Sequence, residues 1–108
     1  MSIHLPPAID LYVRAENAGD VESLSQCFAH DATVRDEART YDGLPAIKIW
    51  KAETKRKYNH TVEPLEVANR DDKTVVKARL TGTFPGSPVT VEFRFVLEGG
   101  KIVSLEIG

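Results

Sequence analysis

The sequence predicts an α+β domain in which three helices precede a curved, mixed or antiparallel sheet. Apolar side chains recur mainly at helical spacing up to residue 58 and alternate at the two-residue period of strands from residue 61 onward. Three short turn signals divide the second half into paired strands: Asp71-Asp72, Pro85-Gly86-Ser87-Pro88 and Gly99-Gly100. One sheet face is almost wholly apolar, so we expect the helices to pack against it.

The first helix is expected to begin at Pro6 and Pro7, because the first turn of a helix contains N–H groups without helical partners. Gly19 suits the left-handed residue that ends such a helix. The inward stripe of this helix comprises Ile9, Tyr12, Val13 and Glu16.

A second helix and a short strand are expected next. Asp20 can cap the helix, whose buried stripe comprises Val21, Leu24 and Phe28. After His30-Asp31 the period changes, and residues 32–36 alternate as a strand does. The inward face of this strand comprises Ala32, Val34 and Asp36.

The third helix is expected after a polar segment, residues 37–43. It starts at Leu44-Pro45, and its inner face is marked by Ile47, Trp50 and Tyr58. The lysines at positions 48, 51 and 55 make one side of the helix basic, and a solvated face explains them adequately.

Four strands are expected over residues 61–69, 74–84, 88–98 and 101–107. In the third of these, Val89, Val91, Phe93, Phe95 and Leu97 share one face. The opposite face of the sheet carries Lys77, Arg79, Glu92 and Arg94, and Lys77 or Arg79 could pair with Glu92 across strands. This polar, self-complementary face is expected to form a homodimer.

Composition limits the functions that remain open. A chain of 108 residues is expected to be one domain, residues 1–108, and a net charge of −2 argues against a nucleic-acid partner. No apolar run approaches the length of a membrane span, and the N-terminus lacks the pattern of a signal peptide. A single cysteine, Cys27, fits a reducing compartment. We therefore expect a cytoplasmic protein that does not bind membranes.

Tyr12 and Asp36 are the candidate catalytic residues. Each is a polar side chain within a mainly apolar stripe, so both are expected to face one apolar pocket. A carboxylate and a hydrogen-bond donor in such a pocket suit proton abstraction beside a carbonyl. The alternatives are a core tyrosine and a strand-end carboxylate paired with Arg35, Arg39 or Lys51.

The other expected contacts of a ligand come from the helices and the long strands. Glu16 lies one turn after Tyr12, and it is either a solvated residue near the helix end or an acid at the pocket mouth. Phe28 and Trp50 are expected in the core, with pocket lining as a second role. The expected ligand-contacting residues are Glu16, Phe28, Trp50, Val91, Phe93 and Phe95.

Other chemistries have little support in the sequence. The three histidines do not have metal-ligand spacing, so no metal site and no cofactor are expected. Cys27 and His30 have no orienting third group, and Cys27 is expected to behave as a small buried apolar residue. There is no glycine-rich phosphate loop, since Gly99-Gly100 is a hairpin turn.

The order helix–helix–strand–helix–meander resembles the nuclear transport factor 2-like superfamily, which has a cystatin-like fold with a cone-shaped pocket. Within it the chain is similar to the SnoaL-like and ketosteroid isomerase-like families. The residues that carry the resemblance are Tyr12, Asp20, Phe28-Ala29, Asp31-Ala32-Thr33-Val34, Asp36, Gly43, Ala46-Ile47, Phe93-Arg94-Phe95 and Gly100-Lys101-Ile102-Val103-Ser104.

This resemblance implies that Tyr12 is an oxyanion-hole donor and Asp36 a general base, as in the isomerase. Three positions differ from the isomerase. Val91 replaces its buried acid, Lys51 stands where a supporting tyrosine is common, and Glu16 stands where an apolar residue is usual. Since losing one oxyanion donor costs about 10²–10³ in rate, we expect weak activity on an unactivated ketone.

Three functions therefore remain open at this stage. The first is an enzyme, of ketosteroid isomerase or polyketide cyclase type, that acts on an apolar or carbonyl-containing small molecule. The second is a non-catalytic module that binds such a ligand, and the third is a dimerisation domain. An epoxide-opening site of the Asp–Arg–Asp type is more distant, because alternation directs Arg35 away from Asp36.

Overall fold

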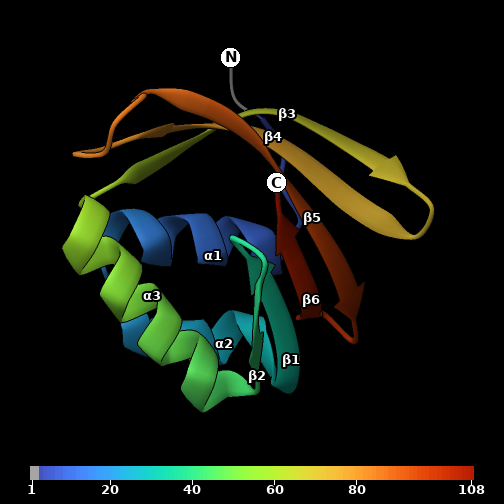
Figure 1. Ribbon diagram of the computed structural model, residues 1–108. Coiled ribbons are helices and arrows are strands. Elements are labelled where there is room, and N and C mark those ends of the chain that lie inside the picture. Colours follow the sequence, from blue (N-terminus) through green and yellow to red (C-terminus); the bar gives the residue numbers. More distant parts are fainter. Residues whose placement is uncertain (1–2) are drawn as a thin grey trace.

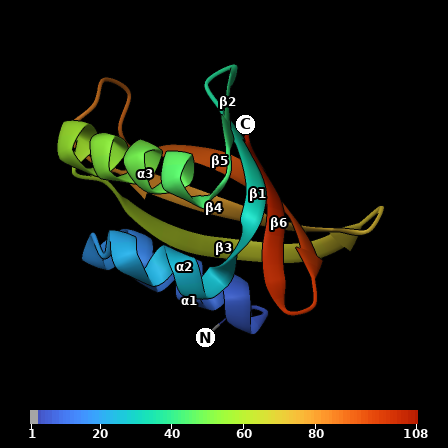
Figure 2. The ribbon, with the colours of Figure 1, turned by 90° about the horizontal axis from the view of Figure 1, so that it is seen from below.

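The computed structural model describes residues 3–108 as three helices and a short 3₁₀ turn packed on one curved sheet. The sheet bends around the helices, which lie on its concave side (Figures 1 and 2). The helical elements are α1 (Pro7–Ala18), η1 (Val21–Ser23), α2 (Leu24–Cys27) and α3 (Leu44–Tyr58). Residues 1 and 2, which the sequence includes in the domain, lie outside the described part.

Six strands form the sheet in the order β2-β1-β6-β5-β4-β3. Their bounds are β1 (Phe28–Asp36), β2 (Arg39–Asp42), β3 (Thr61–Arg70), β4 (Lys73–Thr81), β5 (Val89–Glu98) and β6 (Lys101–Ile107). The last strand, β6, lies parallel to β1 and antiparallel to β5, so the sheet is mixed. The predicted α+β class, with helices covering one face of a mixed sheet, is confirmed.

The predicted turns are present, and two of them are tight hairpins. Asp71 and Asp72 have φ values of 49° and 65°, and Gly99 and Gly100 have values of 57° and 79°. Two consecutive residues with positive φ make the turn that matches the right-handed twist of paired strands. The long strands β3–β4 and β5–β6 therefore pair as the alternation indicates.

Two details near the N-terminal half differ from the prediction. The second helix ends at Cys27, because Phe28 is already extended and pairs with Ile102 of β6. The polar segment contains a further strand, β2, which pairs with β1 through a turn at Glu37 and Ala38. Neither residue is a usual one for positive φ, so the turn chemistry gave no signal of a hairpin here.

The main core lies between the sheet and the helices. The ring of Tyr12 from α1 packs edge-on against Phe28 and Phe95 at centroid distances of 5.7 Å, and Phe93 lies 6.1 Å away. All four aromatic residues are buried. Because aromatic pairs of this geometry stabilise a core beyond their buried area, this cluster fixes α1 against β5.

The outer sheet face carries the predicted charges, but they pair differently from the expectation. Lys77 lies opposite Glu92 in the strand register, yet its ammonium is 3.8 Å from Glu66 of β3. Arg79 contacts Glu63 at 3.2 Å, and Glu92 contacts Arg94 at 3.3 Å. The neighbouring strand β3 supplies acids that the alternation of β4 alone could not reveal.

A dimer through this outer face stays a prediction. The ladder of mixed charges on β3, β4 and β5 is self-complementary, which suits a two-fold interface. We expect light scattering at micromolar concentration to give twice the mass of the chain. A mass of 12.0 kDa, that of one chain, would count against the interface.

No helix within residues 3–108 is long and apolar enough to span a bilayer.

The structure makes a prediction about Gly82, which follows β4. A Cβ atom at this position would lie 2.6 Å from the backbone oxygen of Tyr58 and 3.0 Å from the Cα atom of His60. Gly82→Ala is therefore expected to reduce the free energy of unfolding by about 1–3 kcal/mol, because two backbone segments must separate. Chemical denaturation measures this change, and the exposed neighbour Thr81→Ala is the control. Equal stability of Gly82→Ala and wild type would contradict the close packing.

Candidate functional site

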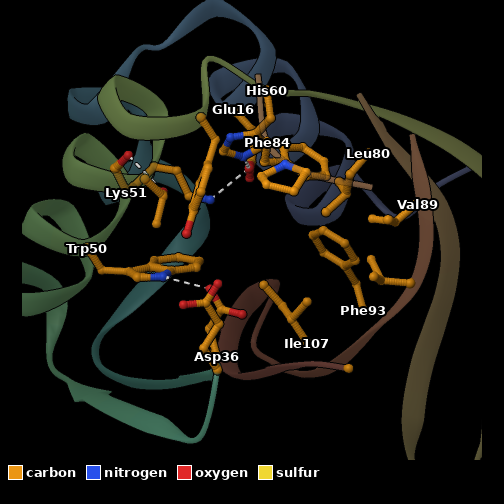
Figure 3. Close-up of a pocket in the computed structure, with 16 residues that line it drawn as sticks. Glu16, Asp36, Trp50, Lys51, His60, Leu80, Phe84, Val89, Phe93 and Ile107 are labelled. Carbon is orange, nitrogen blue, oxygen red and sulfur yellow. Dashed lines mark hydrogen bonds and ion pairs between the residues drawn. The ribbon is translucent and has the colours of Figure 1, made fainter. Parts of the chain in front are cut away.

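A cavity of about 540 Å³ lies between α3 and the inner face of the sheet, as Figure 3 shows. This volume is within the range of small-molecule sites. Its apolar wall comprises Trp50, Leu80, Phe84, Pro85, Val89, Val91, Phe93 and Ile107. Its polar and remaining lining residues are Glu16, Asp36, Glu37, Lys51, Thr54, Tyr58, His60 and Gly108.

Asp36 lies at one side of the cavity, at the end of β1. Its carboxylate accepts a hydrogen bond of 3.1 Å from the indole Nε1–H of Trp50 on α3. Burial raises the pKa of Asp36 above its ordinary value, and the bond from Trp50 opposes that rise. A partly desolvated carboxylate held in one orientation is a suitable general base.

A second polar group lies at the α1 side of the cavity and is centred on Glu16. The Glu16 Oε1 atom accepts a hydrogen bond of 2.7 Å from the Lys51 ammonium and is also in contact with Nε2 of His60. The three side chains are 1%, 5% and 8% exposed, respectively. We refer to Glu16, Lys51 and His60 as the buried triad.

The triad holds Glu16 in its ionised form. Burial alone would raise the pKa of Glu16, but the Lys51 charge and the hydrogen bonds from His60 and Lys51 outweigh burial and lower the pKa to about 2. The contact with His60 Nε2 is then a donation from histidine to carboxylate. Glu16 is therefore a buried anion whose charge is neutralised by the Lys51 ammonium.

Tyr12 lies behind this triad rather than at the cavity surface. Its hydroxyl makes no contact within residues 3–108 that meets the geometric limits of a hydrogen bond, and the Oε2 atom of Glu16 is likewise unmatched. Tyr12 contributes less to the low pKa of Glu16 than Lys51 and His60 do. Burial, followed by the charge of Glu16, raises the pKa of Tyr12 well above 10, so its phenol is neutral.

Trp50 connects the two polar groups. The Lys51 ammonium lies 3.9 Å from the centroid of the Trp50 ring, while the indole edge donates to Asp36. Tyr41 of β2 packs near the same indole at 5.8 Å. A cation over an indole face is attracted by the ring electrons, so Lys51 and Asp36 are both positioned by one side chain.

The structure brings together five of the residues that the sequence singled out: Glu16, Asp36, Trp50, Val91 and Phe93 line the cavity. Tyr12, Phe28 and Phe95 do not line it. The expectation that Tyr12 and Asp36 face one pocket is therefore wrong for Tyr12. The Tyr12 ring packs against Phe28, Phe93 and Phe95, and of these three only Phe93 lines the cavity.

Two expectations about charge are also corrected. Of the two alternatives for Glu16, the solvated residue is wrong, and the solvated face expected for Lys51 is wrong as well. Each side chain is buried because the other neutralises it. Sequence reasoning missed His60 entirely. One signal was present for Lys51: it follows Ile47 by four residues and precedes Thr54 by three, which is the spacing of an inward helical stripe.

No group of three histidine, cysteine, aspartate or glutamate side chains in residues 3–108 is arranged to hold a metal ion. Cys27 is buried, and burial raises the pKa of its thiol to about 11.

Comparison with known proteins identifies the family. Residues 9–105 match the SnoaL-like domain family, and the chain belongs to it. Among proteins with curated descriptions, none matches the chain by sequence.

Solved structures of other proteins share this fold. A candidate polyketide cyclase from Sinorhizobium meliloti is 39% identical, with a TM-score of 0.92 over 96% of this chain and 95% of that one. A Catenulispora acidiphila protein with a ketosteroid isomerase-like fold, bound to trimethylamine, is 24% identical, with a TM-score of 0.83 and coverages of 97% and 86%. The candidate polyketide cyclase IdmH from Streptomyces antibioticus is 20% identical, with a TM-score of 0.77 and coverages of 97% and 91%.

The triad predicts a large loss of stability when its acid is removed. Glu16→Gln leaves the Lys51 charge buried without its counter-ion, so the free energy of unfolding should fall by about 3–5 kcal/mol. The matched control is Glu22→Gln, because Glu22 forms an exposed pair with Lys48 at 3.0 Å, and such pairs contribute about 1 kcal/mol or less. If urea titration shows equal losses for the two variants, Glu16 is not the counter-ion of a buried charge.

The low pKa of Glu16 also predicts how stability depends on pH. Its pKa falls from 4.5 to about 2 on folding, so the unfolded chain binds a proton at a higher pH than the folded protein. The Glu16 contribution is complete above about pH 4.5 and is lost as the pH falls toward 2, amounting to about 3 kcal/mol. Urea midpoints between pH 6 and pH 2 should therefore fall more steeply for wild type than for Glu16→Gln. Parallel curves would show that a group other than Glu16 causes the loss of stability in acid.

Proposed function

We propose that this protein binds a small, mainly apolar carbonyl compound and moves a proton at the carbon next to the carbonyl, with Asp36 as the base. The observation that carries the proposal is the position of Asp36. Its carboxylate lies at the wall of a mainly apolar cavity, is partly desolvated and is held by Trp50.

The physical chemistry of this carboxylate suits proton abstraction. Desolvation raises its pKa, which makes it a stronger base than a solvated aspartate while it stays ionised near neutral pH. The hydrogen bond from the Trp50 indole is accepted by one oxygen atom, Oδ2, and within residues 3–108 no hydrogen bond holds the other oxygen, which can face a ligand. A well-placed general base contributes about 10²–10⁴ in rate.

The proposed reaction is the transfer of a proton from carbon to Asp36 and its later return. The carboxylate of Asp36 takes the proton, the C–H bond breaks, and its electron pair forms a carbon–carbon double bond as the carbonyl oxygen becomes an enolate. The proton on Asp36 then returns to the same carbon or to the far end of a conjugated enolate. Alternatively, the enolate carbon attacks a second carbonyl of the same molecule, and the alkoxide that forms takes the proton back from Asp36. Neither outcome requires an oxidant or a further reactant.

The substrate class follows from what the cavity offers. Val91 carries no proton donor toward the enolate, so a ketone with a weakly acidic C–H is a poor substrate. A carbon between two carbonyl groups is more acidic and needs less help. Polyketide-like compounds contain such carbons, and the candidate polyketide cyclase at 39% identity supports this class.

Tyr12 enters the proposal in a changed role. Its neutral phenol lies beside Glu16 and away from the cavity, so we propose that it positions the triad instead of touching the substrate.

A non-catalytic ligand-binding module is the second candidate function. It is favoured by the placement of Tyr12, because the phenol that would complete an isomerase-like pair with Asp36 does not line the cavity.

The test compares Asp36→Asn with wild type in the exchange of carbon-bound hydrogen for solvent deuterium, followed by NMR. We expect wild type to accelerate exchange of 2-tetralone and of an acyclic 1,3-diketone, with a loss of at least about 100-fold in Asp36→Asn. A 3-oxo-Δ5 steroid should isomerise weakly or not at all. The control is Asp42→Asn on the exposed strand β2, which should behave as wild type.

Two results would contradict the proposal. Equal exchange by wild type and Asp36→Asn on every compound would favour the binding module. Rapid isomerisation of the plain steroid would show that Val91 does not limit the chemistry.

The same substitution makes a prediction about stability. Because burial raises the pKa of Asp36, its ionised form destabilises the folded protein above the ordinary pKa of 3.8. Asp36→Asn removes that charge and keeps an oxygen that can accept from Trp50. Its melting temperature at pH 7 should therefore equal or exceed that of wild type, whereas a clear decrease would mean that Asp36 is a structural residue.

A further inference from the structure

Lys51 is a buried cation that is both part of the triad and part of the cavity wall. Its ammonium donates to Glu16 at 2.7 Å, lies 3.9 Å from the Trp50 ring centroid and 5.5 Å from that of Tyr12. The residue is only 4% exposed, yet it lines the cavity. A lysine is therefore held in one place by a carboxylate and an indole.

The ammonium has more donors than the protein uses. Lysine carries three N–H groups, and within residues 3–108 an oxygen atom accepts only one of the three, in the bond to Glu16. A second direction is covered by the face of Trp50. Because Lys51 borders the cavity, its remaining donor capacity is available to an acceptor atom of a bound ligand.

We infer that Lys51 binds the carbonyl oxygen of the ligand and stabilises the enolate oxygen that forms there. This inference rests on the proposed function and gives the enolate a donor other than Tyr12. Lys51 and Asp36 flank the indole of Trp50, one over its face and the other at its N–H edge, as Figure 3 shows. The base and the cation therefore reach the cavity from adjacent positions on its wall.

The charges agree with this assignment. When Asp36 takes a proton its negative charge disappears, and a negative charge develops on the enolate oxygen. A fixed ammonium beside that oxygen favours the transfer, and Glu16 keeps the ammonium oriented before the substrate arrives. Lys51 thus takes the place of Tyr12 as one donor to the enolate, while Val91 still supplies no second donor.

The position of Lys51 beside an apolar wall also narrows the class of ligand. A compound with a carbonyl or enolate oxygen at one end and an apolar body matches Lys51 together with the wall of Phe93, Val91 and Val89. The planar enol of a bicyclic ketone has this form, and 2-naphthol is a stable compound of the same shape.

The test uses 2-naphthol as a probe, because its ionised form carries the oxygen charge of an enolate. Lys51→Met alone would leave Glu16 buried without a counter-ion, so the test variant is Glu16→Gln combined with Lys51→Met. The matched control combines Glu22→Gln with Lys48→Met, which removes the exposed pair between Glu22 of η1 and Lys48, one turn before Lys51 on α3. Circular dichroism establishes that both variants fold.

The readout is the absorption band of the naphtholate as a function of pH. Wild type should bind naphtholate more tightly than neutral naphthol, so the bound probe should ionise at a lower pH than the free probe. The test variant should lose about 10- to 100-fold in naphtholate affinity, since hydrogen bonds to charged groups are of that strength. The control pair should match wild type.

The outcomes separate this inference from the proposed function. Asp36→Asn should keep the preference for naphtholate while it loses hydrogen exchange. The inference is overturned if wild type shows no preference for naphtholate, or if the test variant binds it as tightly as wild type does. Reduction with cyanoborohydride in the presence of 2-tetralone should leave Lys51 unmodified. A covalent adduct on Lys51 would mean that the lysine forms an imine with the ketone, and this would contradict the hydrogen-bonding role.

Discussion

One carboxylate, that of Glu16, joins three separate parts of the chain. It comes from α1, holds Lys51 from α3, and contacts His60 just before β3, while Tyr12 lies beside it on its own helix. Next to this junction Gly82 lets the end of β4 approach the backbone of Tyr58 and His60. The polar end of the cavity therefore depends on a charge that must stay ionised inside the protein.

Such a buried ion pair does little for stability by itself. The desolvation of two charges offsets most of their attraction, and well-packed apolar residues of similar size often serve equally well. The core of this domain already contains a tight aromatic cluster around Tyr12. Apolar residues could therefore replace the whole triad at little cost, although removing one member alone is costly. Because the triad also reaches the cavity wall, we propose that it is present for its effect on a ligand.

Most of the fold could be predicted from the sequence, because its signals are local. The helical stripe of α3 and the alternation of β4 and β5 each depend only on neighbouring residues. The turns at Asp71-Asp72 and Gly99-Gly100 have residues suited to positive φ. The strand β2 was missed because its turn is made by Glu37 and Ala38. These residue types rarely adopt positive φ, so they do not signal a turn.

The site was less predictable, since it depends on contacts between distant positions. Asp36 and Trp50 could each be assigned to an inward face, but their hydrogen bond joins β1 to α3. Glu16, Lys51 and His60 are polar, and each one alone is most simply interpreted as a surface residue. Only the three-dimensional arrangement shows that each makes the burial of the others possible. For the same reason Tyr12, whose stripe points inward, faces Glu16 and not the cavity.

The central claim is that Glu16 remains an anion at the junction of α1, α3 and β3. The most direct measurement is a ¹³C NMR titration of its side-chain carboxyl carbon in the folded protein. We predict that this resonance stays constant from pH 7 to about pH 3 and moves only as the pH approaches 2. A titration midpoint near the ordinary value of 4.5 would show that Glu16 is not held by Lys51 and His60, and would contradict the account.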